Sequence, residues 1–336
     1  PEAAPEEWLN CDQCTDCFKP AFNYRPKQSA QYALAISNFD SIGENPQRYN
    51  FGFIASTDDH TARPGTGYKQ YERRKMTFAM GPKSKMWEYK NDAIDPNFPE
   101  LPSIEPGESN PASERVSSFV YPGGILAVHS QGRSKDQIWL ALKNKNVYGT
   151  SGPRILLWFN LINSPSGNAP MGSEITMSQN PRFVVRAAGS FKQKEGCPSE
   201  SIDALSSERL NYLCAGECYN PSNERNVIER IEIIKITPQE YSGEAISPLI
   251  QDAWKTLSCF GKSECVVEFE DENYSRDSVY YVRAIQQATL AINGGAMSTE
   301  RDFKLCKGSF RTNLSDDCLA LDNERAWSSP IYLNKP

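Results

Sequence analysis

Histidine is the scarcest residue able to bind a metal in this chain, with two in 336 residues. One of them lies in the stretch FGFIASTDDHTARPGTGY, residues 51–68, where Asp58, Asp59 and His60 follow an apolar run. An aspartate oxygen and a histidine nitrogen held at a strand end suit zinc, manganese or iron. A hydrogen-bonded turn or a helix-capping aspartate is the alternative. The tripeptide leaves both interpretations open.

Other residues add little to the hypothesis of a metal site. Arg63 and Lys69 could contact an anionic group of a substrate, or could be solvated charges. His129 lies within the apolar stretch ILAVHSQG, and a packed strand residue is favoured there over a metal ligand. A hydrolytic metal centre usually draws on several histidines and carboxylates. We therefore do not expect this chain to hold a complete zinc-type cluster, although carboxylates alone could bind Ca or Mg.

Ten cysteines form the second chemically informative set. Three fall in CDQCTDC, which could bind zinc or an iron–sulfur cluster, but disulfides are favoured because only three sulfurs are local. Others form close pairs in polar sequence, namely Cys214 with Cys218, Cys259 with Cys265 and Cys306 with Cys318. This usage predicts disulfides and an oxidising compartment, so a secreted, periplasmic or cell-surface protein. The candidates are Cys11, Cys14, Cys17, Cys197, Cys214, Cys218, Cys259, Cys265, Cys306 and Cys318.

Charge and hydropathy argue against nucleic-acid binding and against a membrane span. The formal net charge is −6 with acids and bases well mixed, and no basic stripe could neutralise a phosphate backbone, so nucleic acid is not expected. No run approaches the ~18 apolar residues of a membrane span. The first ten residues, PEAAPEEWLN, lack the basic and apolar regions of a signal peptide, so an export signal would lie outside this chain.

The elements that would position the motif follow an α/β order. A helix is predicted within residues 28–42, and residues 50–57 predict a strand buried on both faces that delivers Asp58 and His60 at its carboxyl end. Residues 75–118 are rich in Pro, Asn, Glu and Ser and predict a long surface excursion. A strand over 123–130 and a helix capped by Ser134 and ended by GTSGP complete this part. We expect residues 1–152 to be α/β in style.

The pattern changes after Pro153. Short β-branched and aromatic runs at 154–162, 182–191, 230–238, 264–271 and 278–289 are separated by turn residues. Isoleucines interleave with charged residues in IERIEIIKI, which is typical of half-buried antiparallel strands. Residues 153–336 therefore predict a β-rich, sandwich-like domain.

With these residues in view, the chain resembles the carboxyl-terminal part of the bacterial family called domain of unknown function 3604, itself similar to the PHP (polymerase and histidinol phosphatase) metal-dependent hydrolases. The matching stretches include YNFGFIASTDDHTARPGTGYKQY, GGILAVHSQGRSKDQIWLALKNKNVYGTSGPRI, GECYNPS, YYVRAIQQATLAINGG and ERAWSSPIYL. The resemblance implies a distorted β/α barrel that binds divalent metal ions (Zn, Mn, Fe or Ca) and a metal-bound hydroxide that attacks a phosphoester or related substrate. Asp58 and His60 match its late Asp-x-His motif, and Asp59 occupies the variable middle position.

The departure from that family is large, because its opening Gly-Asp-Leu-His-x-His-Thr motif does not occur in this sequence. The implied fold is therefore α/β: the carboxyl-terminal part of a PHP-like barrel in residues 1–152, followed by the sandwich-like domain. The missing strands and ligands would come from the amino-terminal half of the same precursor or from another subunit. The second hypothesis is a non-catalytic binding or structural protein, such as a surface-layer, filament or glycan-binding component, which keeps the fold without a complete metal site.

Overall fold

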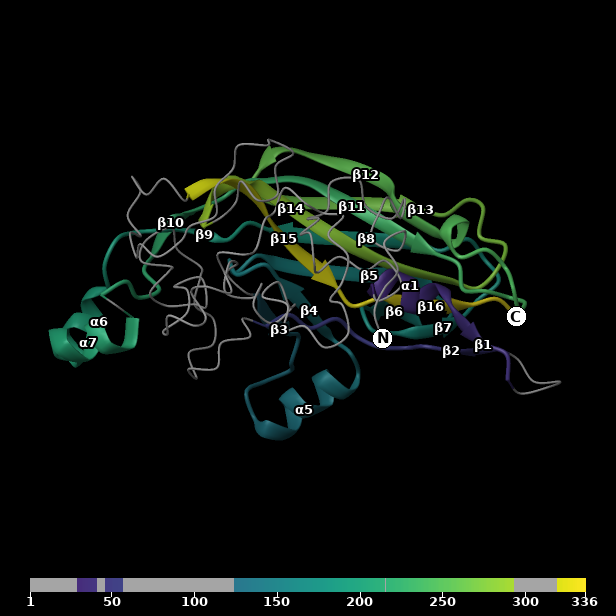
Figure 1. The fold of residues 1–336 in the computed structure, drawn as a ribbon, viewed down its shortest axis with the longest axis horizontal. Coiled ribbons are helices and arrows are strands. Elements are labelled where there is room, and N and C mark those ends of the chain that lie inside the picture. Colours follow the sequence, from purple (N-terminus) through teal and green to yellow (C-terminus); the bar gives the residue numbers. More distant parts are fainter. Residues whose placement is uncertain (1–28, 41–45, 57–123, 215, 293–318) are drawn as a thin grey trace, which may run out of the picture.

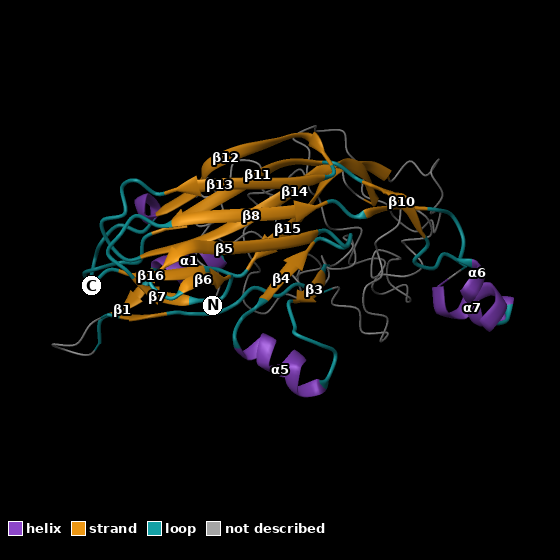
Figure 2. Cartoon of the chain, turned by 180° about the vertical axis from the view of Figure 1, so that it is seen from behind, coloured by secondary structure: helices purple, strands orange, loops and turns teal. Residues whose placement is uncertain are grey.

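The structure is a computed structural model that describes residues 29–40, 46–56, 124–214, 216–292 and 319–336. Strands dominate this part of the chain, and the few helices are short (Figures 1 and 2). The helices are α1 (Ala30–Ala35), α5 (Lys135–Lys143), α6 (Ser199–Ala204) and α7 (Ser207–Cys214), with one 3-10 turn, η5 (Ser247–Leu249). None of the described helices is long and apolar enough to cross a bilayer.

The strands fall into two large sheets and two small ones. The eight-stranded sheet has the order β12-β11-β14-β15-β4-β3, with β16 paired to β14 and β7 paired to β16; the four-stranded sheet has the order β13-β8-β5-β6. Every pairing in them is antiparallel except that of β16 with β7. The strands are β1 (Ser37–Asn38), β2 (Gln47–Arg48), β3 (Ile125–Val128), β4 (Val147–Thr150), β5 (Leu156–Ser164), β6 (Gly167–Pro170), β7 (Glu174–Thr176), β8 (Arg182–Ala188), β9 (Phe191–Gln193), β10 (Pro221–Arg225), β11 (Ile228–Ile236), β12 (Ile250–Lys262), β13 (Glu264–Glu270), β14 (Ser278–Ile292), β15 (Leu319–Ser328) and β16 (Ile331–Asn334).

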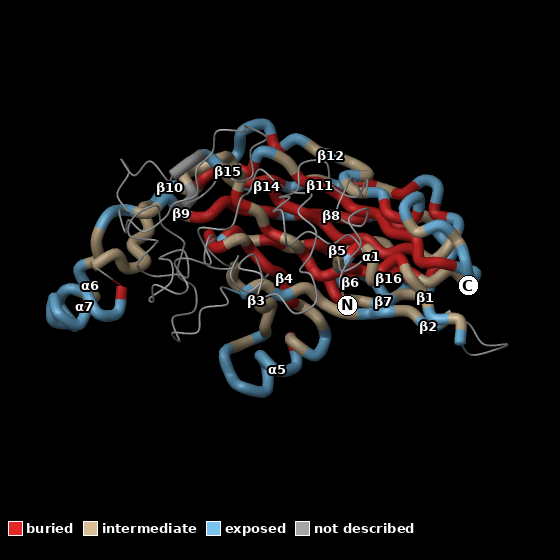
Figure 3. Tube along the Cα trace, viewed as in Figure 1, coloured by how far each residue is buried: buried red, intermediate tan, exposed pale blue. Residues whose placement is uncertain are grey.

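The main hydrophobic core lies between the two large sheets. Alternate residues of β5 and β8 face alternate residues of β11 and β14, and Phe159, Phe183 and Phe269 stack there with centroids 4.9–6.4 Å apart. Figure 3 shows the buried positions concentrated in these strands, whereas α5, α6 and α7 are largely exposed. Two sheets that bury their facing sides in this way form a sandwich.

A second, smaller core covers the outer face of the eight-stranded sheet. Leu34 and Ala35 of α1, together with Phe51 and Phe53, pack there against side chains that include Ile234 and Tyr281. The Phe53 ring meets the Tyr281 ring edge-on at 5.0 Å. Helix α1 and the segment around residues 51–53 therefore form a partial third layer.

Charged side chains are buried on both faces of β11, and each has a partner. On the outer face, Arg283 donates to Glu232 at 2.8 Å and to Asp252 at 2.9 Å. On the inner face, Lys235 donates to Asp271 at 2.5 Å. The half-buried strand predicted for IERIEIIKI is thus antiparallel as expected but covered on both faces. The alternation of isoleucine and charge predicts a solvent-exposed face, which β11 lacks because its buried charges are paired.

The predicted β/α barrel is wrong. Among the described residues no sheet closes into a barrel, and the fold is β-rich. The error arises at β3, α5 and β4, whose strand–helix–strand order resembles a parallel crossover unit. These two strands instead pair antiparallel with each other, Ile125 opposite Thr150, and β4 also pairs with β15. Helix α5 projects from the sheet as part of a long hairpin connection (Figure 1).

Local predictions within residues 28–150 had mixed outcomes. Ser134 caps α5 as predicted and forms a capping box with Gln137, but the helix ends at Lys143 and GTSGP overlaps β4. The helix predicted within 28–42 is limited to α1. Residues 51–56 belong to no strand, and Ile54 is 70% exposed, so the expected doubly buried strand is not formed. The excursion at 75–118 lies outside the described residues.

Candidate functional site

The predicted metal motif begins two residues beyond the described segment 51–56. Asp58, Asp59, His60, Arg63 and Lys69 lie outside the described residues, so what is visible is the backbone that leads to them. Hydrogen bonds to the eight-stranded sheet and its flanking residues hold that backbone as far as Ser56.

Hydrogen bonds anchor this segment along its length. The Tyr332 hydroxyl accepts from the Phe51 N–H at 2.8 Å and donates to the Phe51 carbonyl at 2.6 Å. The Phe53 N–H donates to Ser329 Oγ at 2.9 Å. At the far end, the Gly124 N–H donates to the Ser56 carbonyl at 2.9 Å. Burial raises the pKa of Tyr332, so its hydroxyl keeps its proton and both bonds at physiological pH.

Segment 51–56 ends next to Gly124 and Gly149, which have no side chain to obstruct it. A Cβ added at Gly149 would lie 2.7 Å from the Ala55 Cβ, and one added at Gly124 would lie 2.8 Å from the same atom. Neither distance is compatible with an ordinary carbon contact. Glycine at both positions therefore permits the close approach of residues 55–56 to β4.

A buried carboxylate lies near this end of β4 and was missed by sequence reasoning. Glu324, which is 4% exposed, accepts a hydrogen bond from Ser151 Oγ at 2.5 Å. Ser151 directly follows β4, and its N–H donates to the Arg325 carbonyl. Glu324 stands in the stretch ERAWSSPIYL, more than 260 residues from Asp58. Such a separation gives no spacing signal, so only the pairing of β15 with β4 brings it here.

His129 lies at the other end of β3 from the Gly124–Ser56 contact. Its ring packs between Tyr148 and Trp158, with centroids 5.3 and 5.8 Å away, and Nε2 is 2.8 Å from the Leu157 carbonyl oxygen. Burial lowers the pKa of His129, although the bond to Leu157 opposes the shift. The neutral ring therefore donates from Nε2. His129 is therefore a packed residue, as the sequence favoured, although it directly follows β3 rather than lying in it.

The cysteines differ in part from the predicted pairs. Cys259 and Cys265 are bonded as expected, and they join β12 of one sheet to β13 of the other. Cys218 is bonded to Cys197 rather than to Cys214. Proximity along the chain is a poor guide there because residues 197 and 218 flank the α6–α7 pair and are brought together when it folds. Cys11, Cys14, Cys17, Cys306 and Cys318 lie outside the described residues.

The sulfurs of Cys197, Cys214 and Cys218 form the one group in the described part of the chain that could hold a metal ion. Cys214 Sγ lies 2.8 Å from Cys218 Sγ and 3.6 Å from Cys197 Sγ. Cysteine binds zinc as the thiolate, but the sulfurs of Cys197 and Cys218 are bonded to each other in the disulfide. The group therefore does not fit a metal while that bond is intact.

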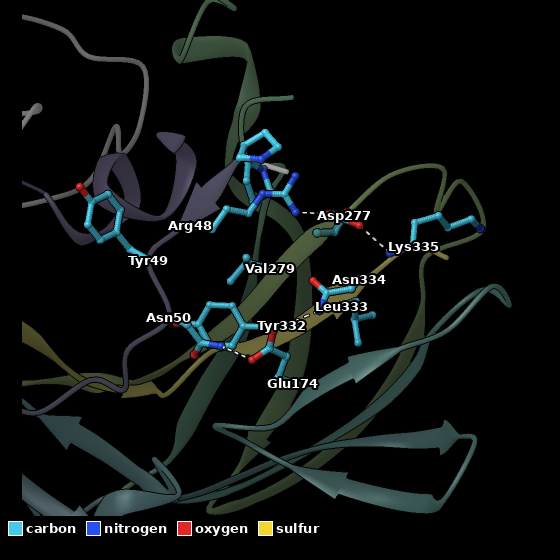
Figure 4. A pocket seen from close by; sticks show the side chains of 13 residues that line it. Arg48, Tyr49, Asn50, Glu174, Asp277, Val279, Tyr332, Leu333, Asn334 and Lys335 are labelled. Carbon is cyan, nitrogen blue, oxygen red and sulfur yellow. Dashed lines mark hydrogen bonds and ion pairs between the residues drawn. The ribbon is translucent and has the colours of Figure 1, made fainter. Parts of the chain in front are cut away.

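A cleft of about 660 Å³ opens near the carboxyl terminus, between the segment after β2, β7, the start of β14 and β16 (Figure 4). Glu174 lies at its centre and accepts from Asn50 Nδ2 at 2.6 Å and from Asn334 Nδ2 at 3.1 Å. Arg48 and Asp277 form an ion pair on the opposite wall. This cleft contains no residue of the predicted metal motif, and it is treated separately below.

Comparison with known proteins gives one match. Residues 30–195, about half of the chain, match the family model described as "Protein of unknown function (DUF3604)". The match supports membership of the DUF3604 family. The matched DUF3604 region includes Asp58, His60 and His129, as well as segment 51–56 and both glycines that accommodate it. Neither the curated proteins nor the solved structures contain a match.

Proposed function

We propose that this chain is one part of an exported metal-dependent hydrolase, to which Asp58 and His60 contribute two metal ligands. The observation that carries the proposal is the anchored segment 51–56, which holds the backbone on the sheet up to Ser56. A metal site needs ligands with restricted positions, and an anchored segment that ends two residues before Asp58 is in keeping with that need. The similarity of the DUF3604 family to PHP hydrolases supports a phosphoester or related substrate.

The chain's own residues can be assigned roles in such a site. Asp58 would supply an oxygen and His60 a nitrogen, and Glu324 is a candidate third ligand because its carboxylate lies near the end of β4 that Ser56 approaches. Arg63 and Lys69 would contact an anionic substrate group. A bound Zn, Mn, Fe or Ca ion would act as a Lewis acid and lower the pKa of a coordinated water. The remaining ligands would come from the amino-terminal part of a precursor or from another subunit.

Export is part of the same proposal. The two disulfides between described cysteines are of a kind that persists in oxidising compartments, which supports a secreted, periplasmic or cell-surface location. Fractionation of the native host cells, with the protein detected by antibody in the periplasm or medium, would test this location.

The hydrolase proposal is tested by phosphodiester hydrolysis in the protein as isolated from its host, with any bound partner retained. Hydrolysis of bis(p-nitrophenyl) phosphate should be abolished by a chelator and restored by Mn²⁺ or Zn²⁺. His60→Ala should lower kcat by roughly 100-fold or more, because it removes a ligand of the ion that supplies the nucleophile. His129→Gln is the matched control and should retain activity. Hydrolysis that is absent, or that survives both the chelator and His60→Ala, would contradict the proposal.

The second candidate is the non-catalytic binding or structural protein, and one observation favours it. The described residues form a β-sandwich with a polar cleft, an architecture that serves binding as readily as catalysis. A protein that binds no divalent metal and hydrolyses no phosphoester, yet binds a ligand at that cleft, would belong to this class.

A further inference from the structure

The cleft of Figure 4 has the dimensions of a small-molecule site. Its volume of about 660 Å³ falls within the ~300–1,000 Å³ typical of ligand pockets. Five stretches of chain far apart in sequence form it, and they contribute residues such as Tyr49, Glu174, Asp277 and Asn334. Backbone pairing holds the walls formed by β7, β14 and β16 together, because β16 pairs with β14 on one side and with β7 on the other.

The charged groups of the cleft are already neutralised, which argues against an ionic ligand. Arg48 pairs with Asp277, and the Lys335 N–H donates to the same carboxylate at 2.5 Å. The Lys335 amine donates to the carbonyls of Ser178 and Tyr274, and Figure 4 shows it directed away from the cleft. Glu174 lies near Lys145. Burial lowers the pKa of the Lys145 amine, and the negative charge of Glu174 opposes that shift. Arg48 and Asp277 are thus paired with each other, and the positive charge of Lys145 lies near Glu174, so the cleft offers an ionic ligand little free charge.

The remaining polar groups suit hydroxyls. Glu174 accepts from two amides, one on each side, so Asn50, Glu174 and Asn334 form a continuous amide–carboxylate–amide row on the cleft wall (Figure 4). Each amide uses one N–H in this row, and an amide carries two. Neighbouring hydroxyls of one ligand could accept from the second N–H groups and donate to the carboxylate oxygens, each of which has a second lone pair.

An aromatic side chain completes the set. Tyr49 lines the edge of the cleft and is 51% exposed, and Figure 4 shows its ring directed away from the amide–carboxylate row, so the ring would turn to meet a ligand. An aromatic ring of this kind offers an apolar face with a polar tip. The C–H face of a sugar ring is the matching surface on a polyhydroxylated ligand.

We propose that this cleft binds a neutral saccharide, with Asn50, Glu174 and Asn334 bonded to its hydroxyls and Tyr49 packed against its ring. The site is distinct from the proposed metal site and does not depend on it. Its role would be to hold a glycan, or a glycan-bearing surface, close to the rest of the protein.

The test is binding of the full chain to an array of neutral and acidic oligosaccharides, followed by calorimetry with the best neutral oligosaccharide on the array. Asn334→Ala and Tyr49→Ala should each weaken binding at least tenfold. Both side chains are at the surface of the cleft, so these variants are expected to remain folded, and circular dichroism checks this. Tyr212→Ala is the matched control: Tyr212 is 63% exposed on α7, at the far end of the molecule (Figure 1).

Three outcomes would overturn the proposal. These are an array on which no neutral saccharide is bound, a preference for acidic over neutral oligosaccharides, and an affinity that Asn334→Ala and Tyr49→Ala leave unchanged. Binding of neutral saccharides that survives removal of divalent metal would leave the proposal intact, even if the hydrolase proposal failed.

Discussion

His129 is one of two histidines in this chain, and it should control part of the pH dependence of stability. His129 packs between Tyr148 and Trp158 and donates from Nε2 to a backbone carbonyl. Burial lowers the pKa of His129 in the folded state below its ordinary value of 6.5. Below that ordinary value the unfolded chain therefore binds more protons than the folded one, which favours unfolding.

The expected result is a loss of stability as the pH falls from about 7.5 through the ordinary histidine pKa of ~6.5 and into the lower folded range. Urea unfolding midpoints at several pH values measure it. His129→Gln should flatten this part of the profile, because glutamine can still donate to the Leu157 carbonyl but does not titrate. An identical pH profile in wild type and variant would contradict the assignment of this effect to His129.

Residue-level prediction from the sequence worked where the signal was local. The Ser134 cap and the Cys259–Cys265 pair are each encoded within a few residues and appear as predicted. Glu324 and the cleft residues Glu174 and Asn334 could not be found, because their proximity to other site residues depends on strand pairings across more than 100 residues. Asp58 and His60 remain predictions.

Among the elements, the segment 51–56 connects the sheet to the proposed metal motif, and its fit over β4 can be tested. In Gly149→Ala the new Cβ would come 2.7 Å from the Ala55 Cβ. Overpacking of this kind typically costs about 1–3 kcal/mol. We expect a loss of unfolding free energy in that range, and a fall in metal affinity because the backbone before Asp58 is displaced.

Urea unfolding and a metal titration of the same preparation measure the two effects. Ser222→Ala, in β10 on the small sheet, serves as a comparison in a strand that does not contact this segment. A Gly149→Ala protein with unchanged stability and unchanged metal affinity would show that the close approach of Ala55 is not needed.

The position of a strand is easier to predict from the sequence than the strand with which it pairs. The alternating and apolar runs after Pro153 coincide with β5, β8, β11, β13 and β14, because side-chain periodicity reports which residues are buried. Periodicity does not report strand pairing. The strand over 123–130 and the helix after it predict an α/β unit, but β3 pairs antiparallel with β4, which the sequence does not predict as a strand. The same limit explains β11, where isoleucines that interleave with charge predict a half-buried strand, but Glu232 is buried and paired with Arg283.

At the scale of the whole molecule, the eight-stranded sheet unites distant parts of the chain. Strand β4 pairs with β15 and β3 pairs with β4, so residues 125–128, 147–150 and 319–328 share one sheet, and β5 begins the other. This arrangement brings Ser56, Ser151 and Glu324 toward one region and the cleft residues toward another. The molecule thus offers two separate candidate sites, one for a metal and one for a neutral saccharide.

The central claim is that Asp58 and His60 bind a divalent metal, and the metal content of the purified protein tests it most directly. The protein should be isolated from its host with its partners, without chelators, and analysed by inductively coupled plasma mass spectrometry beside His60→Ala and His129→Gln. A stoichiometric divalent metal is expected in the wild type and in His129→Gln, and it should be lost in His60→Ala. A wild-type protein without bound metal, or a His60→Ala protein that retains it in full, would show that these two residues are not metal ligands.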